Sequence, residues 1–375
     1  MTPPRRVAVL TGTRAEFGLL TPVMHAIDRH PDLELLVVAA GMHLIGDPPT
    51  INEVRARFPV TALIHMQAND DSGRIADALA FSRGVEGVAH FCEEHAPDWF
   101  VVLGDRIEAF AGAAAASIGG VAVAHIHGGD RAEGIADEAM RHAITKLAHL
   151  HLPATQQSAE RIERMGEDPE RIVVVGSPGV DGMGSVAPLD NAAWSALGTP
   201  SVVILHHPVG RSIEDEQAEA EAIAEACAQE PTLWLAPNRD PGWQGIAEAR
   251  QRAQRTKLVD HLDHATYRAL LKRMAQEGSV LVGNSSSGLI EACIVGCPVV
   301  NIGDRQSGRE RGAGVVDVPR GTDAGFVRAA IERARSLAGT IDHPFGDGRT
   351  GERVAEVLGR TDPTVTGFVR KRSTY

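Results

Sequence analysis

Short apolar runs alternate with amphipathic helical stretches along almost the whole chain. This alternation predicts parallel strands in sheets whose two faces are covered by helices. In the first half, the apolar runs predict strands at residues 6–10, 34–40, 61–66, 99–103, 121–126, 149–152 and 171–175. Strands in this arrangement form one doubly wound domain.

The second half restarts the same pattern. Strands are predicted at residues 201–206, 232–236, 257–260, 279–283, 298–302 and 314–318, and helices at Glu214–Glu230, Thr266–Gln276, 323–338 and 350–359. Between the halves, the stretch from Gly176 to Pro200 is rich in Gly, Pro, Ser and Asp, with one short predicted helix around Trp194. Such a composition indicates an interdomain linker.

The predicted fold class is therefore α/β, with two doubly wound parallel-sheet (Rossmann-like) domains. A length of 375 residues suits two domains of roughly 150–200 residues each. We expect an N-terminal domain at 1–185, a C-terminal domain at 186–355, and a tail at 356–375 that packs back on the N-terminal domain.

Composition and charge narrow the partners. No apolar run reaches the ~18–20 residues that cross a bilayer, and the run from Val7 to Leu10 is too short for a secretory signal. A net charge of −12 argues against a nucleic-acid surface, and the four scattered cysteines lack the spacing of a zinc site. We expect a cytoplasmic protein that binds neither membrane nor nucleic acid.

Ligands of open parallel sheets bind outside the carboxyl ends of the strands, and polar residues cluster there. The turn Thr11–Glu16 follows the first strand and offers helix-start amides with Arg14 beside them, although an ordinary helix cap explains it equally well. Asp105 and Arg106 follow the strand at 99–103. A carboxylate beside a cation suits a general base, and a helix-capping Asp is the alternative.

The next strand leads into His125, His127 and Asp130, and a helix with Asp137 and Glu138 follows. Strand alternation would place both histidines on one face, where one is a core residue and the other reaches the ligand. A metal site lacks the usual ligand spacing, and a salt-bridged surface helix is the other alternative.

The second half carries three further candidate segments. His206-His207-Pro208 and Pro237-Asn238-Arg239 each end a strand, and either is also compatible with ordinary loop chemistry. The turn Asn284–Gly288 places small residues before a helix, where backbone amides can approach a diphosphate. The loop 301–312 carries three arginines, whose planar forks suit phosphate oxygens.

Taken together and in order, these segments resemble the hydrolysing UDP-N-acetylglucosamine 2-epimerases of the sialic-acid-precursor type. The matching motifs are TGTRAEFGLL, GMHLIGD, VLGDRIEA, HIHGGD, DEAMRHAITKLAHLHLPAT, VGSPGVD, HHPV, GNSSSGLIEA and NIGDRQSGRERG. The resemblance implies a glycosyltransferase-B-like architecture, with the nucleotide held mainly by the second domain. It also implies anti elimination of UDP to a 2-acetamidoglucal, followed by addition of water to give N-acetylmannosamine.

The resemblance assigns roles by motif position. Catalytic candidates are Asp105, His127, Asp130, Asp137 and Glu138. Nucleotide and phosphate candidates are Arg14, His207, Asn238, Ser285, Ser286, Ser287, Glu291 and Arg305, and substrate-binding candidates are Arg106, His43 and Arg141. Other members carry Glu where this chain has His127, so either His127 or Asp130 takes over that proton transfer.

The implied reaction needs no cofactor and no metal. Its partners are a UDP-sugar substrate and the UDP product, and the resemblance implies a homodimer or homotetramer. The rivals are a glycosyltransferase of the same architecture, a nucleotide-sugar sensor without catalysis, and the same epimerase chemistry on a GDP-linked or 4-acetamido-modified sugar. The retained carboxylates Asp105, Asp130, Asp137 and Glu138 argue against the first two.

Overall fold

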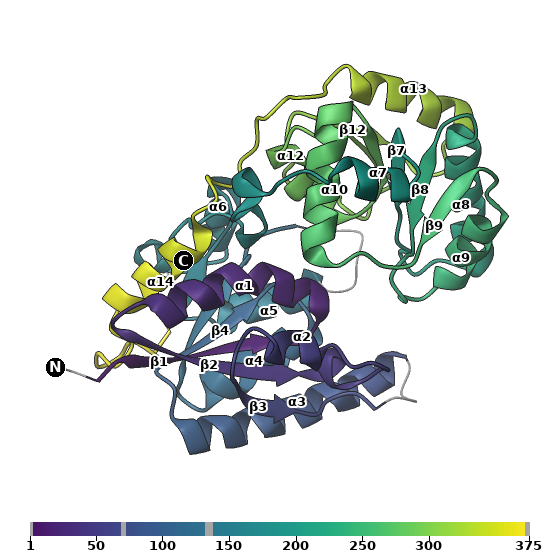
Figure 1. Cartoon of the computed structure of the whole chain (residues 1–375). Helices are drawn as coiled ribbons and strands as arrows, with labels where there is room; N and C mark the ends of the chain where they lie inside the picture. The colour runs from purple at the N-terminus through teal and green to yellow at the C-terminus, as the bar shows by residue number, and fades with distance from the viewer. Residues whose placement is uncertain (1–2, 69–72, 132–137, 372–375) are drawn as a thin grey trace. The chain divides into compact units, whose positions relative to one another are not determined.

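The computed structural model describes residues 3–68, 73–131 and 138–371, which form two compact units. Unit 1 takes in the chain up to Asp181, apart from a short stretch that begins at Arg131, and again from Phe345 onward. Unit 2 runs from Gly182 to Pro344. Each unit is built around one six-stranded parallel sheet (Figure 1).

The sheet of unit 1 has the strand order β3-β2-β1-β4-β5-β6. Its strands are β1 (Arg5–Thr11), β2 (Leu33–Ala40), β3 (Val60–Ile64), β4 (Trp99–Leu103), β5 (Ala122–Ile126) and β6 (Leu150–Leu152). The chain order reverses between β1 and β4. Ligands of doubly wound sheets bind at the carboxyl ends of the strands beside such a reversal.

Alternating side chains of β1 separate the core of unit 1 into two layers. Val7 and Val9 pack with α1 (Arg14–Arg29) and α14 (Thr350–Arg360). Ala8 and Leu10 point to the opposite face, into a core with residues of α3, α4 and α5. The remaining helical elements of this unit are α2 (Ile51–Arg55), α3 (Arg74–His95), α4 (Ile107–Ile118), α5 (Glu138–Leu147), α6 (Gln156–Arg164) and the 3-10 turns Gly41–Leu44, Pro169–Arg171 and Pro178–Val180.

Unit 2 repeats this plan with the strand order β12-β11-β10-β7-β8-β9, which reverses between β7 and β10. Its strands are β7 (Val202–Leu205), β8 (Thr232–Leu235), β9 (Thr256–Val259), β10 (Val280–Gly283), β11 (Val299–Ile302) and β12 (Val315–Val318). Its helices are α7 (Asn191–Ala196), α8 (Ile213–Cys227), α9 (Trp243–Arg252), α10 (His264–Glu277), α11 (Ser286–Leu289), α12 (Glu291–Ile294) and α13 (Ala324–Arg335), with a 3-10 turn at Met183–Ser185. Helices α8, α9 and α13 cover one face, and α7, α10 and α12 cover the other.

One predicted strand is wrong. Residues 171–175 form only an isolated bridge between Ile172 and His151 of β6, so they extend the sheet edge without becoming a strand. Two further backbone bonds follow β6, from Val173 N to His151 O and from Val175 N to Pro153 O. The other predicted strands are present, with ends shifted by at most two residues.

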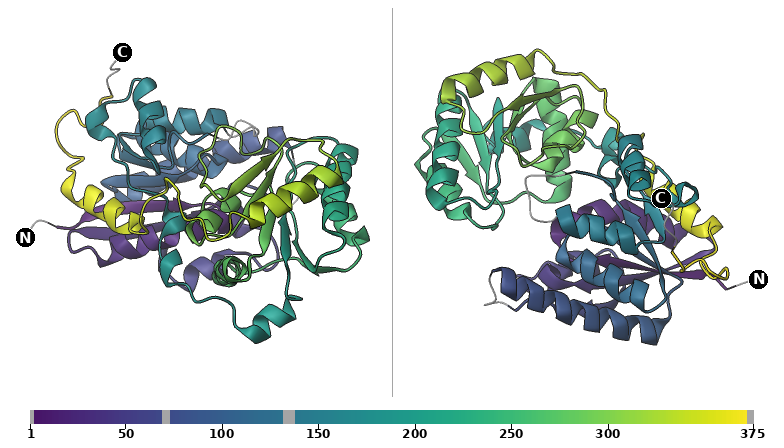
Figure 2. Two further views of the ribbon diagram at one scale, coloured as in Figure 1. Left: turned by 90° about the horizontal axis from the view of Figure 1, so that it is seen from above. Right: turned by 180° about the vertical axis from the view of Figure 1, so that it is seen from behind.

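The domain limits also differ from those predicted. The chain leaves unit 1 after Asp181 rather than Ser185, and residues 345–355 belong to unit 1 rather than to the second domain. The reason is α14, whose buried Val354, Val357 and Leu358 join the core beneath α1. Figure 2 shows this yellow helix beside the purple N-terminal segment in two further views.

Asp181 fixes the start of α14 at the point where the chain leaves unit 1. Its carboxylate accepts hydrogen bonds from the backbone N–H groups of Thr350 (2.8 Å) and Gly351 (2.6 Å). Unpaired amides of a first helical turn are commonly satisfied in this way. Among the described residues, no helix combines the length and apolar character that crossing a membrane requires.

Candidate functional site

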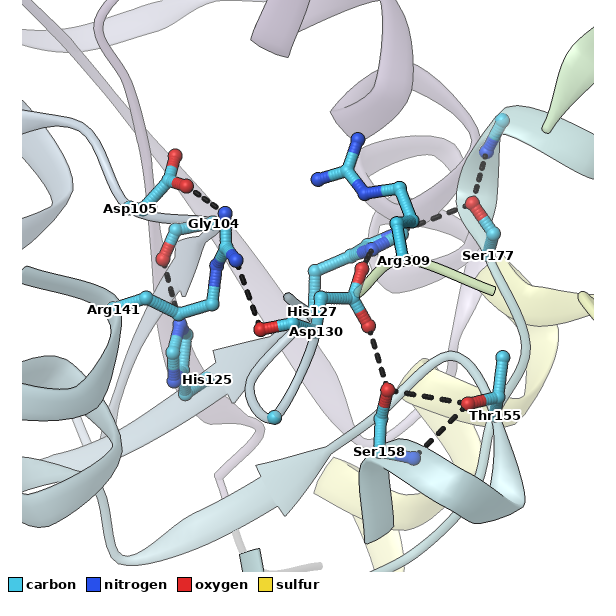
Figure 3. Close-up of polar contacts among 12 residues, drawn as sticks. Gly104, Asp105, His125, His127, Asp130, Arg141, Thr155, Ser158, Ser177 and Arg309 are labelled. Atoms are coloured by element: carbon cyan, nitrogen blue, oxygen red, sulfur yellow. Dashed lines mark hydrogen bonds and ion pairs between the residues drawn. The ribbon is translucent and has the colours of Figure 1, made fainter. Parts of the chain in front are cut away.

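In unit 1, the polar residues after β4 and β5 are gathered by the guanidinium of Arg141 (Figure 3). Arg141 lies in α5 and is only 2% exposed. It pairs with the carboxylate of Asp105, and its Nη1 donates to Glu138 Oε2 at 3.0 Å and to the carbonyl oxygen of Asp130 at 2.9 Å. One buried cation thus holds three segments of chain together.

The carboxylates of Asp105 and Glu138 keep access to solvent. Their side chains are 16% and 20% exposed, whereas that of Arg141 is 3% exposed. Gly104 allows this placement, because its φ of +75° turns the chain directly after β4. Two acidic groups are therefore presented side by side on a buried cationic support.

His127 and Asp130 form a second pair in the turn after β5. His127 Nδ1 lies 2.7 Å from Asp130 Oδ2, and Ser158 Oγ donates to Asp130 Oδ1 at 2.8 Å. With Asp130 ionised, Nδ1 donates to it, and His127 Nε2 accepts from Ser177 Oγ at 3.0 Å. Both ring nitrogens and both carboxylate oxygens are thereby engaged.

The backbone of this turn is unusual. His127 has φ +62°, a left-handed conformation that costs free energy in a non-glycine residue. Gly129 is required at its position, because a Cβ there would lie 2.2 Å from the carbonyl oxygen of Ser158. Because β5 ends at Ile126, strand alternation does not extend to His127, and the expectation that it shares a face with His125 is wrong.

His125 is a core histidine. Its Nε2 lies 2.8 Å from the carbonyl oxygen of Gly104, its Nδ1 lies 3.3 Å from Thr145 Oγ1, and it is fully buried. Burial lowers the pKa of His125 to about 3. The neutral ring ties the end of β5 to the turn that carries Asp105.

The remaining predicted residues of unit 1 lie near the ends of β1, β2 and β4. Arg14 pairs with Glu53 at 3.0 Å, and Arg106 Nε lies 3.4 Å from Glu108 Oε2. His43 is buried between two hydroxyls, with Nε2 3.0 Å from Thr11 Oγ1 and Nδ1 2.8 Å from Thr50 Oγ1. Burial lowers the pKa of His43 to about 4.

Two buried glutamates beside the β1/β4 reversal were not predicted. Glu16 accepts from the Gly12 N–H at 2.8 Å, and Glu108 is fully buried and accepts from Gln67 Nε2 at 2.9 Å. Burial, reinforced by the nearby charge of Glu108, raises the pKa of Glu16 to about 8. The signal in the sequence was a glutamate in the first turn of each helix that follows these strands, which resembles a common capping residue.

In unit 2, the side chain of Asn284 connects the end of β10 to the end of β7. Asn284 is 2% exposed; its Oδ1 accepts from the His207 N–H and its Nδ2 donates to the His207 carbonyl oxygen, both at 2.8 Å. His207 Nδ1 accepts from the Asn238 N–H at 3.1 Å. Loss of solvent lowers the pKa of His207 to about 3, so its Nε2 carries the proton of a neutral ring.

The serine turn, Ser285–Ser287, directly follows Asn284. Ser285 Oγ and Ser287 Oγ lie 3.0 Å apart, and the Tyr267 hydroxyl lies 2.7 Å from Ser287 Oγ. Glu291 Oε1 lies 3.2 Å from His264 Nε2. Helix α11 begins at Ser286 and ends after one turn at Leu289, so the helix predicted after the serine turn is shorter than expected.

Arg305 is connected to the same turn. Its Nη1 donates to the carbonyl oxygen of Asn284 at 3.2 Å, as does the buried Gln306 through Nε2 at 2.9 Å. The predicted nucleotide-binding residues of unit 2 therefore gather around its β7/β10 reversal. Asp137, the remaining catalytic candidate, lies outside the described residues.

A protein-family model described as UDP-N-acetylglucosamine 2-epimerase matches residues 25–359. A UDP-N,N'-diacetylbacillosamine 2-epimerase (hydrolyzing) of Legionella pneumophila is 33% identical over 99% of this chain and 100% of its own length. A UDP-N-acetylglucosamine 2-epimerase of Neisseria meningitidis is also 33% identical, over 94% of this chain and 95% of its own length.

Solved structures show the same fold. The crystal structure of UDP-GlcNAc 2-epimerase from Neisseria meningitidis bound to UDP-GlcNAc covers 95% of this chain with a TM-score of 0.79 and 16% identity, and 100% of that chain is covered. The Methanocaldococcus jannaschii UDP-GlcNAc 2-epimerase in complex with UDP-GlcNAc and UDP gives a TM-score of 0.80 at 18% identity, over 95% of this chain and 100% of that chain. The predicted class, two doubly wound domains in a glycosyltransferase-B-like fold, is confirmed.

Proposed function

Because the chain belongs to the UDP-N-acetylglucosamine 2-epimerase family, we propose that it is a hydrolysing 2-epimerase. It converts UDP-N-acetylglucosamine to N-acetylmannosamine and UDP. The observation that carries this proposal is the pair of solvent-accessible carboxylates, Asp105 and Glu138, held side by side by the buried Arg141. This pair lies after β4 and β5, at the carboxyl ends of the strands, where ligands of a doubly wound sheet bind.

The proposed reaction has two stages. In the first, the bond from C1 to the diphosphate oxygen breaks, a base removes the proton at C2, and UDP leaves with the bonding electrons. A double bond between C1 and C2 results. In the second, water adds its oxygen to C1 and a proton is delivered to C2. Inversion at C2 requires that proton removal and proton delivery occur on opposite faces of the ring.

We assign the two proton transfers to two separate acid–base groups. We assign removal of the C2 proton to Asp105, with Glu138 beside it, because these carboxylates are the more accessible ones. We assign delivery of the proton to His127. Its Nε2 takes up a solvent proton in place of the Ser177 hydrogen bond and passes it to C2, while Asp130 holds Nδ1–H through the 2.7 Å contact. A carboxylate that orients an imidazole in this way is a common arrangement for proton transfer. Asp137 remains a further candidate from its motif position.

Departure of the diphosphate leads the reaction, since the C2 proton is only weakly acidic. Donors to the phosphates therefore accelerate the step by stabilising the negative charge that develops. We assign this role to the Nε2–H of His207, to Arg305 and to the serine turn Ser285–Ser287 of unit 2. Arg14, Asn238 and Glu291 complete the proposed nucleotide-binding set, and Arg106 and His43 the sugar-binding set.

A second candidate substrate is the 4-acetamido-modified sugar. It is favoured by the Legionella pneumophila relative, which is a UDP-N,N'-diacetylbacillosamine 2-epimerase and matches this chain over its full length. The chemistry at C1 and C2 is the same for both sugars, so the residue roles above are unchanged. Comparing kcat/KM for the two UDP-sugars decides between them.

The substitution Asp105→Asn tests the proposal. We expect UDP release from UDP-N-acetylglucosamine, measured without any acceptor, to fall by about 10²–10⁴-fold through loss of the general base. UDP binding, measured by calorimetry, should stay nearly unchanged because the nucleotide is assigned to unit 2. Asp32→Asn, a matched change at an exposed site, should leave both values unaltered. Unimpaired UDP release from Asp105→Asn would remove Asp105 from the mechanism.

A further inference from the structure

A polar cluster that the proposed reaction does not use lies in unit 2, between the carboxyl end of β7 and the start of α8. It consists of His206, Glu216 and Glu219, with Arg211 among them. The potential ligand atoms of the imidazole and the two carboxylates all lie within 4.8 Å of one another. His206 and Glu216 are buried, and Glu219 is 8% exposed at its side chain.

His206 is the unexplained member of this cluster. It is 1% exposed, and among the described residues neither of its ring nitrogens has a hydrogen-bond partner. A buried polar group without a partner costs free energy, so it calls for a ligand or a function.

The charges of the cluster are unequal. Arg211 Nη2 pairs with both Glu216 and Glu219, and it is the one ion-pair partner that the described residues give to either carboxylate. Glu216 Oε1 is occupied by the backbone N–H groups of Val209 (2.8 Å) and Arg211 (3.2 Å). Arg211 thus lies between one buried and one half-buried carboxylate, next to an unpartnered imidazole, with Arg305 and Arg320 also near the cluster.

We propose that His206, Glu216 and Glu219 bind a divalent transition-metal ion, with Zn²⁺ as the best match, in place of the Arg211 guanidinium. One imidazole nitrogen and two carboxylate oxygens form a donor set that Zn²⁺ accepts readily. The Arg211 side chain is 19% exposed, so it has a route to solvent when the ion binds.

The proposed ion is structural and goes beyond the proposed function, since the epimerase reaction is derived without a metal. It would join the loop that begins at His206 to helix α8. His207 directly follows His206 in this loop, so the ion would stabilise the position of the nucleotide-binding segment.

Zn²⁺ titration of the full chain, competed against a chromophoric chelator, tests this site. We compare the wild type with Arg211→Met, with Arg211→Met combined with His206→Phe, and with Arg211→Met combined with Glu219→Gln. His90→Phe is the matched control, because His90 is exposed and lies 3.9 Å from Glu93. Thermal unfolding without metal confirms that each variant is folded.

We expect one Zn²⁺ per chain to bind at least about tenfold more tightly in Arg211→Met than in the wild type, because the competing cation is gone. Both double variants should lose this gain, and His90→Phe should bind as the wild type does. Equal affinity in Arg211→Met and the wild type would overturn the proposal, as would a gain that survives loss of His206. The Arg211→Met comparison decides the matter even if the His206 variant fails to fold. UDP release remains a separate measurement, so failure here leaves the proposed epimerase untouched.

Discussion

At the scale of single residues, the turn after β5 determines which atoms face a ligand. The left-handed backbone of His127 and the tight fit of Gly129 against Ser158 hold the imidazole in one orientation. Asp130 and Ser177 then bond its two nitrogens. This much constraint on one ring is typical of a residue whose direction matters for function.

We expect His127→Asn to separate the two stages of the reaction. Asn tolerates the left-handed backbone but removes the imidazole, so UDP release should continue while 2-acetamidoglucal accumulates, because its C2 is no longer protonated. Product analysis by NMR measures both. Ser177→Ala, which removes the other ring partner together with the side-chain acceptor of the Gly179 N–H, should cost about 1–2 kcal/mol of stability and still give the complete product. If His127→Asn lost UDP release without forming the glycal, the assignment of His127 to proton delivery would fail.

Glu16 gives a pH-dependent prediction for stability. Its pKa rises from 4.5 to about 8 on folding because of burial, so the folded chain keeps a proton that the unfolded chain releases between these values. The stability that this proton contributes is fully present below pH 4.5 and is lost as pH rises to about 8.

Glu16→Gln is neutral at every pH and should lack this loss. Relative to the wild type, its free energy of unfolding should therefore increase by about 3–4 kcal/mol between pH 5 and pH 8. Denaturant unfolding at both pH values measures the difference. An identical difference at the two pH values would show that Glu16 is ionised in the folded chain.

At the scale of elements, the return of α14 to unit 1 depends on close backbone contact with α1. A Cβ at Gly351 would lie 2.5 Å from the carbonyl oxygen of Pro22 in α1. A Cβ at Gly359, on the same helix, would meet only the ring of His30, which can rotate. The two glycines thus offer a matched pair.

We expect Gly351→Ala to destabilise the chain by about 1–3 kcal/mol, as overpacking against backbone does. Gly359→Ala should be nearly neutral, because the gain in helix propensity offsets the movement of His30. Chemical denaturation compares the two variants. Equal losses would mean that α14 does not dock on α1 through its first turn.

The elements were largely predictable from the sequence, because strands of both sheets are short apolar runs between amphipathic helices. The segment 171–175 misled because it has the apolar pattern of a strand but lies at an edge, where only Ile172 forms a bridge. Packing between segments that are distant in the sequence was harder to predict. Nothing local in residues 345–355 indicates that the helix they open packs beside α1 rather than in unit 2.

The candidate site was likewise only partly predictable from the sequence. Motif order placed Asp105 after β4, His127 and Asp130 after β5, and Glu138 in the next helix, as the structure has them, while their roles stay a prediction. The sequence did not reveal that Arg141 lies beneath the acidic groups. This contact requires the Arg141 side chain to reach from α5 to Asp105 after β4 and to the backbone of Asp130 after β5. Buried charges such as Glu16 and Glu108 resemble capping residues until their burial is known.

At the scale of the whole molecule, two units of the same plan divide the proposed work. Each has one reversal of strand order, and each carries its candidate residues after strands at or next to that reversal. Unit 1 carries the groups assigned to proton transfer, and unit 2 carries those assigned to the nucleotide, apart from Arg14 of unit 1. The net charge of −12 means that an anionic substrate must be held by a few local donors rather than by the general field of the protein.

Proton NMR of the reaction in deuterium oxide tests the central claim most directly, with UDP- and GDP-N-acetylglucosamine offered separately. Elimination followed by solvent protonation predicts release of UDP together with N-acetylmannosamine that carries deuterium at C2. The UDP-linked donor should be the one consumed. Release of a manno sugar that keeps its original C2 proton, or of unchanged N-acetylglucosamine, would contradict the account.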